Sequence, residues 1–258
     1  SVFVMVYNTR RFDNSALLNV LGAGFFSVAM LDFFHTLAYK GMGIFTGYDA
    51  NLPTQLWVAL RYVHSLTMLA ALLLMGKQVR FRWLMAISGG ISLLLLVAIF
   101  SRVFPTAYIE GVGLTPFKII SEYAVAAIYL CVIGLLFAKK QQFDPKVFQL
   151  LVAASAGAIV TGMFFTLYFS VYDVFNKLGH YLNLISFYLV YKAVLDTGLR
   201  RPYALLFREL KQSEESLRRS EGLLRSVFGN ASVILMATDR QGVITLLDGK
   251  ELRDLGIR

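Results

Sequence analysis

Apolar residues in this sequence gather into blocks long enough to cross a membrane, and this limits the chain to few folds. A helix needs roughly 20 mostly apolar residues to cross about 30 Å of hydrocarbon. Six blocks reach that length: residues 15–38, 54–75, 83–101, 117–138, 147–170 and 178–198. Hydrophobic residues make up 57% of the chain and charged residues 16%, whereas soluble domains have about 45–50% and about 25%. We therefore expect an integral membrane protein and exclude a soluble enzyme with one core.

A seventh span is expected at the start of the chain. Residues 1–7 read SVFVMVY and are followed by Asn8-Thr9-Arg10-Arg11, which is typical of the cytoplasmic end of a span. The sequence has no initiator Met, so we expect a fragment whose first span is truncated. The single cysteine, Cys131, excludes an internal disulfide.

Basic residues in the connections alternate between a rich and a poor side, which predicts the orientation. The poor side holds Lys40, Arg102, Lys118 and Lys177, whereas the rich side holds ten residues: Arg10, Arg11, Lys77, Arg80, Arg82, Lys139, Lys140, Lys146, Arg200 and Arg201. Because cytoplasmic loops are enriched in Lys and Arg, the C-terminus is expected in the cytoplasm and the N-terminus outside. Most of the net charge of +9 then reflects topology and the polar tail, and no nucleic-acid partner is needed to explain it.

Residues 199–228 are polar and helical in pattern. Positions spaced alternately by four and three form a heptad seam: Leu206, Leu210, Ser213, Leu217, Ser220, Leu224 and Val227. This seam predicts a parallel two-stranded signalling helix and hence a homodimer, with two serines keeping the packing weak. A solvated amphipathic linker is the alternative.

Short β-like runs replace the helical pattern after residue 229. SVILMATD and VITLLD flank the turn residues Arg240-Gln241-Gly242, which predicts a β-hairpin. The stretch LLRSVFGNASVILMATDRQGVITLLDGKELRDLGI resembles the opening of a PAS domain. The resemblance implies that residues 229–258 begin an α/β PAS fold that continues beyond the chain.

Ionisable residues inside the predicted spans are functional candidates, because they are costly to bury. With a rise of about 1.5 Å per residue, Asp32, Arg61 and Glu122 lie roughly 8–10 Å below the outer boundary. By the same measure His35 and His180 lie within about 5 Å of that boundary, and His64 at about 15 Å. The candidates therefore concentrate in the outer half of the membrane.

The three histidines are predicted to surround one ligand- or cofactor-binding site with Asp32 or Glu122. Arg61 lies three residues before His64, and Asn183 three after His180, so each pair shares a helix face. Imidazole and carboxylate ligands suit zinc, copper or iron, for which His35, His64 and His180 are the candidate metal ligands. Two facing histidines suit haem b. An organic or lipophilic ligand in a polar outer cavity, or sensing of the bilayer itself, stays open.

Each candidate also has a purely structural interpretation. Asp32 and Arg61 would form an ion pair within the bundle, and Glu122 a local pair with Lys118 one turn before it. His35 and His180 would cap helix ends at the interface. Tryptophans near the boundaries, Trp57 and Trp83, would belong to the aromatic belt.

Three long motifs resemble the third type of the bacterial membrane-associated sensor domains (MASE). His35 lies in DFFHTLAYKGM, Glu122 in TPFKIISEY and His180 in GHYLNLISFY, and the resemblance covers roughly residues 1–215. His64 departs from the glutamate associated with that position, which weakens a haem site that depends on it. The resemblance implies a membrane-embedded input module followed by PAS domains and a histidine kinase or diguanylate cyclase output.

These observations together predict an all-α integral membrane bundle of seven spans, followed by a coiled coil and a partial PAS segment. The expected domains are a sensor at 1–198, a signalling helix at 199–228 and a PAS start at 229–258. We expect a sensor in the bacterial inner membrane, with no catalytic activity in this chain. An intramembrane metal-dependent hydrolase is the alternative, because histidines and carboxylates near the outer leaflet can activate water.

Overall fold

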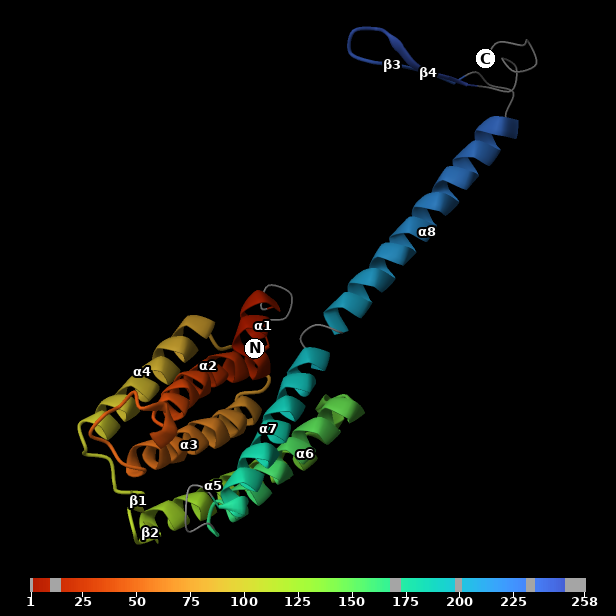
Figure 1. Ribbon diagram of the computed structural model, residues 1–258. Coiled ribbons are helices and arrows are strands. Elements are labelled where there is room, and N and C mark those ends of the chain that lie inside the picture. The colour runs from red at the N-terminus through yellow and green to blue at the C-terminus, as the bar shows by residue number, and fades with distance from the viewer. Residues whose placement is uncertain (1, 10–14, 168–172, 198–200, 231–234, 249–258) are drawn as a thin grey trace. The chain divides into compact units, whose positions relative to one another are not determined.

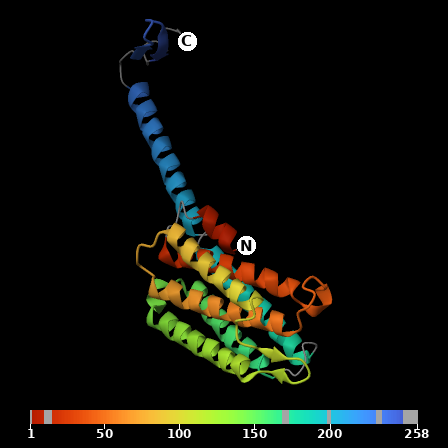
Figure 2. The same cartoon turned by 90° about the vertical axis from the view of Figure 1, so that its left-hand side faces the viewer.

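The computed structural model describes residues 2–9, 15–167, 173–197, 201–230 and 235–248. Two compact units divide the chain, residues 1–202 and 203–258. The first unit is a helical bundle, with its long helices side by side in both views (Figures 1 and 2). Its helices are α1 (Val2–Thr9), α2 (Ala16–Leu37), α3 (Asn51–Leu73), α4 (Phe81–Phe100), α5 (Pro116–Ala138), α6 (Pro145–Phe164) and α7 (Val174–Leu195).

Five of the helices, α2 to α6, are long and apolar enough to cross a membrane. They confirm five of the predicted spans. The sixth predicted span, 178–198, overlaps α7, which has 22 residues but falls outside this group because polar residues interrupt its apolar sequence. The short α1 ends at Thr9, two residues after the predicted apolar block of residues 1–7. The predicted count of seven spans is thus supported only in part.

Proline and capping residues explain where several helices begin. Pro116 and Pro145 occupy the first turns of α5 and α6, where a missing N–H costs nothing. Thr115 and Asp144 precede them, and each side chain accepts a backbone N–H of the first turn. α6 ends at Phe164, six residues before the predicted boundary at 170, and turn-type bonds follow it.

Small residues let the helices of the bundle approach closely. A Cβ on Gly24 of α2 would lie 2.1 Å from Thr67 on α3, and one on Gly157 of α6 would lie 2.5 Å from Ser186 Oγ on α7. Because lipid chains are as apolar as the helix surfaces, the hydrophobic effect does not drive helices together in a membrane, and close packing of this kind does. α4 differs, since apolar residues such as Leu94 point outward and only Ser92 and Ile99 are buried.

A short hairpin, β1 (Tyr108–Ile109) and β2 (Gly113–Leu114), joins α4 to α5. It lies at the end of the bundle where α3 and α5 begin (Figure 1). Short 3-10 turns occur at Lys40–Met42 and Lys140–Gln142.

The second unit contains most of α8 (Arg201–Asn230) and a hairpin of β3 (Leu235–Thr238) and β4 (Ile244–Asp248). The hairpin confirms the predicted one. Its turn is held by Asp239, whose Oδ1 accepts the backbone N–H groups of Gln241 and Val243. The helical prediction for residues 199–228 agrees with α8 from residue 201 onward, and residues 199 and 200 lie outside the described part of the chain.

Candidate functional site

Two predicted histidines meet at the end of the bundle where α3 begins. The rings of His35 on α2 and His180 on α7 stack at 28°, with their centroids 6.1 Å apart. Trp57 of α3 contacts both, at 5.4 Å from His35 and 5.2 Å from His180. Phe165, just after α6, packs on Trp57 at 4.6 Å and on His180 at 5.0 Å. Residues from four segments thus form one ring cluster, defined as His35, Trp57, Phe165 and His180.

The ring cluster borders a small cavity of about 60 Å³. His35 Nδ1 lies 2.8 Å from the carbonyl oxygen of Pro53, which fixes the imidazole against the first turn of α3. The remaining lining includes Tyr39, Thr54 and Asn176. A water molecule occupies about 30 Å³ of liquid, so the cavity has room for about two waters. It is lined by polar and aromatic side chains, and it is well below the range of about 300–1,000 Å³ that is usual for small-molecule sites.

A buried ion cluster contacts Trp57 on the indole Nε1. Arg61 and Glu122 form a salt bridge, with Nε 3.3 Å from Oε2, and Lys118 Nζ donates to Oε1 of the same carboxylate. Trp57 Nε1 also donates to Oε1, at 3.1 Å. All three charged side chains are at most 1% exposed. The ion cluster is defined as Arg61, Lys118 and Glu122.

The ion cluster carries two cations for one carboxylate, so its formal charge is +1. Arg61 Nη2 donates to the carbonyl oxygen of Ala158 at 2.7 Å, while Nη1 has no partner among the described residues. Gly162 on α6 provides the space: a Cβ there would lie 2.9 Å from Arg61 Nη2 and 3.1 Å from Glu122 Oε2. Unbalanced charge at low dielectric is costly, so this cluster is sensitive to any change in its partners.

His64 lies in a different environment from the other two histidines. Its Nδ1 is 2.8 Å from the hydroxyl of Tyr129, and its ring stacks on Phe187 of α7 at 4.6 Å. Phe25 meets its edge at 5.1 Å. His64 is 2% exposed, and its Nε2 has no partner in the described part of the chain.

The structure therefore brings together only part of the predicted site. Asp32 is exposed on α2 and interacts electrostatically with His180, while Asn183 is buried on α7. The predicted ion pair of Asp32 with Arg61 is wrong, because Arg61 points into the bundle and pairs with Glu122 instead. Across the described residues, no three His, Cys, Asp or Glu side chains are grouped to hold a metal ion, so the histidines do not assemble into the predicted three-histidine site.

The environments predicted for Trp57 and Lys118 from the sequence are wrong. Trp57 is 4% exposed and bonds to Glu122, so it does not belong to the aromatic belt, whereas Trp83 is 66% exposed, as a belt residue should be. Lys118, counted among loop cations, is fully buried, and its predicted pairing with Glu122 is confirmed. The sequence signal was present: Trp57 and Arg61 lie one turn apart, as do Lys118 and Glu122.

Comparison with known proteins adds a family assignment. No curated protein and no solved structure matches the chain. A family model described as a membrane-associated sensor domain, MASE3, matches residues 1–202. This region includes the whole bundle and every residue of the ring and ion clusters. The chain belongs to the MASE3 family of membrane-associated sensor domains.

Proposed function

We propose that this chain is the sensory input part of a bacterial histidine kinase or diguanylate cyclase in the inner membrane. Membership of a sensor-domain family supports a non-catalytic input role. The asymmetry of basic residues supports seven spans with the C-terminus in the cytoplasm. The hairpin of β3 and β4 is compatible with the start of a PAS domain.

The signal is the binding of a small molecule at the ring cluster. The observation that carries this proposal is the double role of Trp57, which lines the cavity and donates to Glu122 in the ion cluster. Because the cavity is small, a ligand larger than two waters has to move the rings of Trp57 and His180 apart. Such a ligand binds the open state better than the closed one, and this difference in affinity is what shifts a two-state equilibrium.

Helix α7 relays the change toward the cytoplasm. It contacts α3 at two levels, through His180 against Trp57 and through Phe187 against His64. Residues of α8 follow it in sequence, and the seam residues Leu217 and Leu224 of α8 are 62% and 50% exposed in the single chain. An apolar seam on an otherwise charged helix favours pairing with the same helix of a second copy. The metal-dependent hydrolase has no comparable support among the described residues.

The experiment is disulfide cross-linking in native membranes. Cys131 is free and exposed, so it is first replaced by Ser. In that background, Ser213→Cys and Ser220→Cys on the seam should cross-link two copies readily, whereas Glu215→Cys on the opposite helix face should not. Equal cross-linking on both faces would contradict the dimeric seam.

The relay is tested in the Ser220→Cys background. His180→Ala should change the rate of cross-linking, because it removes the contact of α7 with Trp57 and His35. Tyr181→Ala is the matched control, since the neighbouring Tyr181 is 67% exposed. If the two variants cross-link at the same rate, the ring cluster does not communicate with α8.

A further inference from the structure

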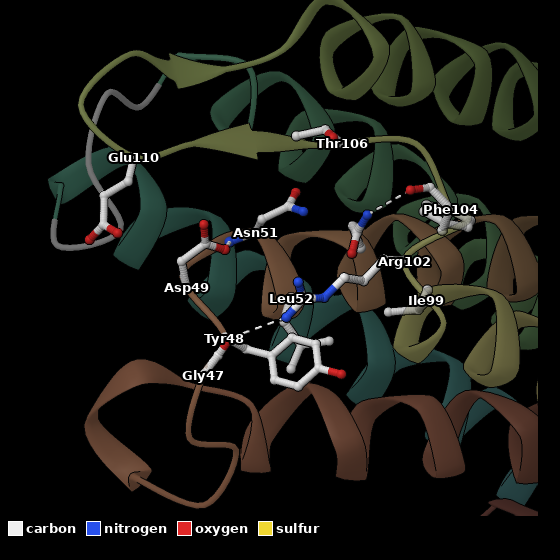
Figure 3. Close-up of a pocket in the computed structure, with 11 residues that line it drawn as sticks. Gly47, Tyr48, Asp49, Asn51, Leu52, Ile99, Arg102, Phe104, Thr106 and Glu110 are labelled. Atoms are coloured by element: carbon white, nitrogen blue, oxygen red, sulfur yellow. Dashed lines mark hydrogen bonds between the residues drawn. The ribbon is translucent and has the colours of Figure 1, made fainter.

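A second cavity, of about 480 Å³, opens between the loops at the end of the bundle where α3 begins and α4 ends (Figure 3). Its volume falls within the range of about 300–1,000 Å³ that is usual for small-molecule sites. Leu52, Ile99 and Phe104 supply its apolar surface. It shares no lining residue with the small cavity at the ring cluster.

The walls of this loop cavity are fixed by hydrogen bonds from α3. Gln55, 5% exposed, donates through Nε2 to the carbonyl oxygens of both Phe104 and Pro105, each at 2.9 Å. Asn51 Oδ1 accepts the backbone N–H groups of Ala107 at 2.8 Å and Tyr108 at 3.0 Å. The connection from α4 to β1 is thereby tied to the first turns of α3. The cavity is consequently preformed, which lowers the entropic cost of binding.

Charged groups of both signs line the loop cavity. In Figure 3 the carboxylates of Asp49 and Glu110 lie to the left, and the side chain of Arg102 enters from the right. The Arg102 guanidinium lies over the ring of Tyr48, 5.4 Å from its centroid, and its Nη2 donates to the carbonyl oxygen of Gly47 at 3.5 Å. Asp49 uses Oδ1 to accept the backbone N–H of Asn51 at 2.9 Å.

Arg102 holds an unusual backbone conformation. Its φ is +59°, and it is the one non-glycine residue with positive φ in the described parts of the chain. This left-handed conformation is unfavourable for a residue with a Cβ. It directs the guanidinium across the cavity toward Tyr48 and Gly47.

We propose that the loop cavity binds a small zwitterion, an amino acid or a short peptide. The Arg102 guanidinium binds the carboxylate of the ligand, and the carboxylates of Asp49 and Glu110 bind its ammonium group. The apolar part of the ligand contacts Leu52, Ile99 and Phe104. With Arg102 the two carboxylates give the cavity a formal charge of −1, so a simple anion would be repelled, and a simple cation would leave the guanidinium fork unused. A molecule with both charges uses the guanidinium and the carboxylates at once, and Arg suits carboxylate recognition because its planar fork can donate two parallel hydrogen bonds.

The test is isothermal titration of the detergent-purified chain with the twenty L-amino acids and the twenty glycyl dipeptides. At least one of these zwitterions should bind, and its matched amine and carboxylate, each lacking one charge, should bind more weakly by about tenfold or more. Arg102→Gln should weaken that binding to a similar degree. Asp49→Asn with Glu110→Gln should do the same, and the new amide oxygen still accepts the Asn51 N–H. Arg82→Gln, at the other end of α4, is the control and should bind as the parent does.

Two results would overturn the proposal. One is that no zwitterion of either panel binds, or that binding survives loss of both Arg102 and the two carboxylates. The other is that an amine lacking the carboxylate binds as tightly as the zwitterion, which would make the cavity a cation site. Since His35 and His180 lie outside this cavity, His180→Ala should leave the titration unchanged. Failure here therefore says nothing against the ring cluster or its relay.

Discussion

The indole Nε1 of Trp57 donates a 3.1 Å hydrogen bond to Oε1 of Glu122, and this bond joins the ring cluster to the ion cluster. The indole contacts His35 and His180, which line the small cavity at the ring cluster. The other contact is with the one carboxylate that two buried cations share. A displacement of Trp57 thus changes the electrostatics of the bundle interior as well as the shape of the cavity.

Trp57→Phe should lower the free energy of unfolding by about 1–2 kcal/mol, because hydrogen bonds to charged groups contribute about 1.5–3 kcal/mol and those between membrane helices average about 0.6. Phenylalanine retains a ring for packing against Phe165. Unfolding in mixed detergent micelles measures the change. Trp83→Phe is the control, since Trp83 is 66% exposed. Equal losses in both variants would assign the effect to ring size rather than to the bond with Glu122.

Glu122→Gln should destabilise the bundle by about 3–5 kcal/mol, because it leaves Arg61 and Lys118 buried without a counter-charge. Adding Lys118→Met should recover part of that loss, since only one buried cation then remains. The same unfolding assay compares the single and double variants. A double variant that is less stable than Glu122→Gln alone would contradict a charge-balance role for the ion cluster.

Gly162→Ala should disturb the ion cluster through sterics alone. The added Cβ would lie 2.9 Å from Arg61 Nη2 and 3.1 Å from Glu122 Oε2, so the salt bridge has to shift. A loss of about 1–3 kcal/mol is expected, as for other overpacked interiors. Gly134→Ala on α5 has no described atom within 4 Å of the added Cβ and should be neutral or stabilising. If Gly162→Ala behaves like Gly134→Ala in the unfolding assay, the close approach of α6 is not required.

Tyr129→Phe should cost about 1–3 kcal/mol, because it removes the hydroxyl partner of His64 Nδ1 and leaves a buried imidazole unsatisfied. Tyr123 lies on the same helix and is 53% exposed, so Tyr123→Phe provides a matched control. Comparison of the two melting temperatures in one detergent separates the buried hydroxyl from a general effect of the substitution. A similar shift in both would show that the bond to His64 contributes nothing.

Local sequence features determined the helices, because the length of an apolar block and the residues that flank it act within one segment. The blocks at 15–38 and 117–138 became α2 and α5 with nearly the predicted bounds. The turn residues Arg240-Gln241-Gly242 between two β-like runs likewise predicted the hairpin of β3 and β4. The family resemblance, carried by contiguous motifs, agrees with the match over residues 1–202.

Tertiary structure decided which polar residues meet. Helical spacing predicts that Arg61 and His64 share a face of α3, but it does not say which neighbouring helix that face meets. Packing places Glu122 of α5 at Arg61, and Tyr129 and Phe187 at His64, so His64 is separated from His35 and His180. Asp32 remains exposed because it lies on the outward face of α2. Contacts between helices depend on close approach at residues such as Gly162, and the spacing within one helix carries no information about it.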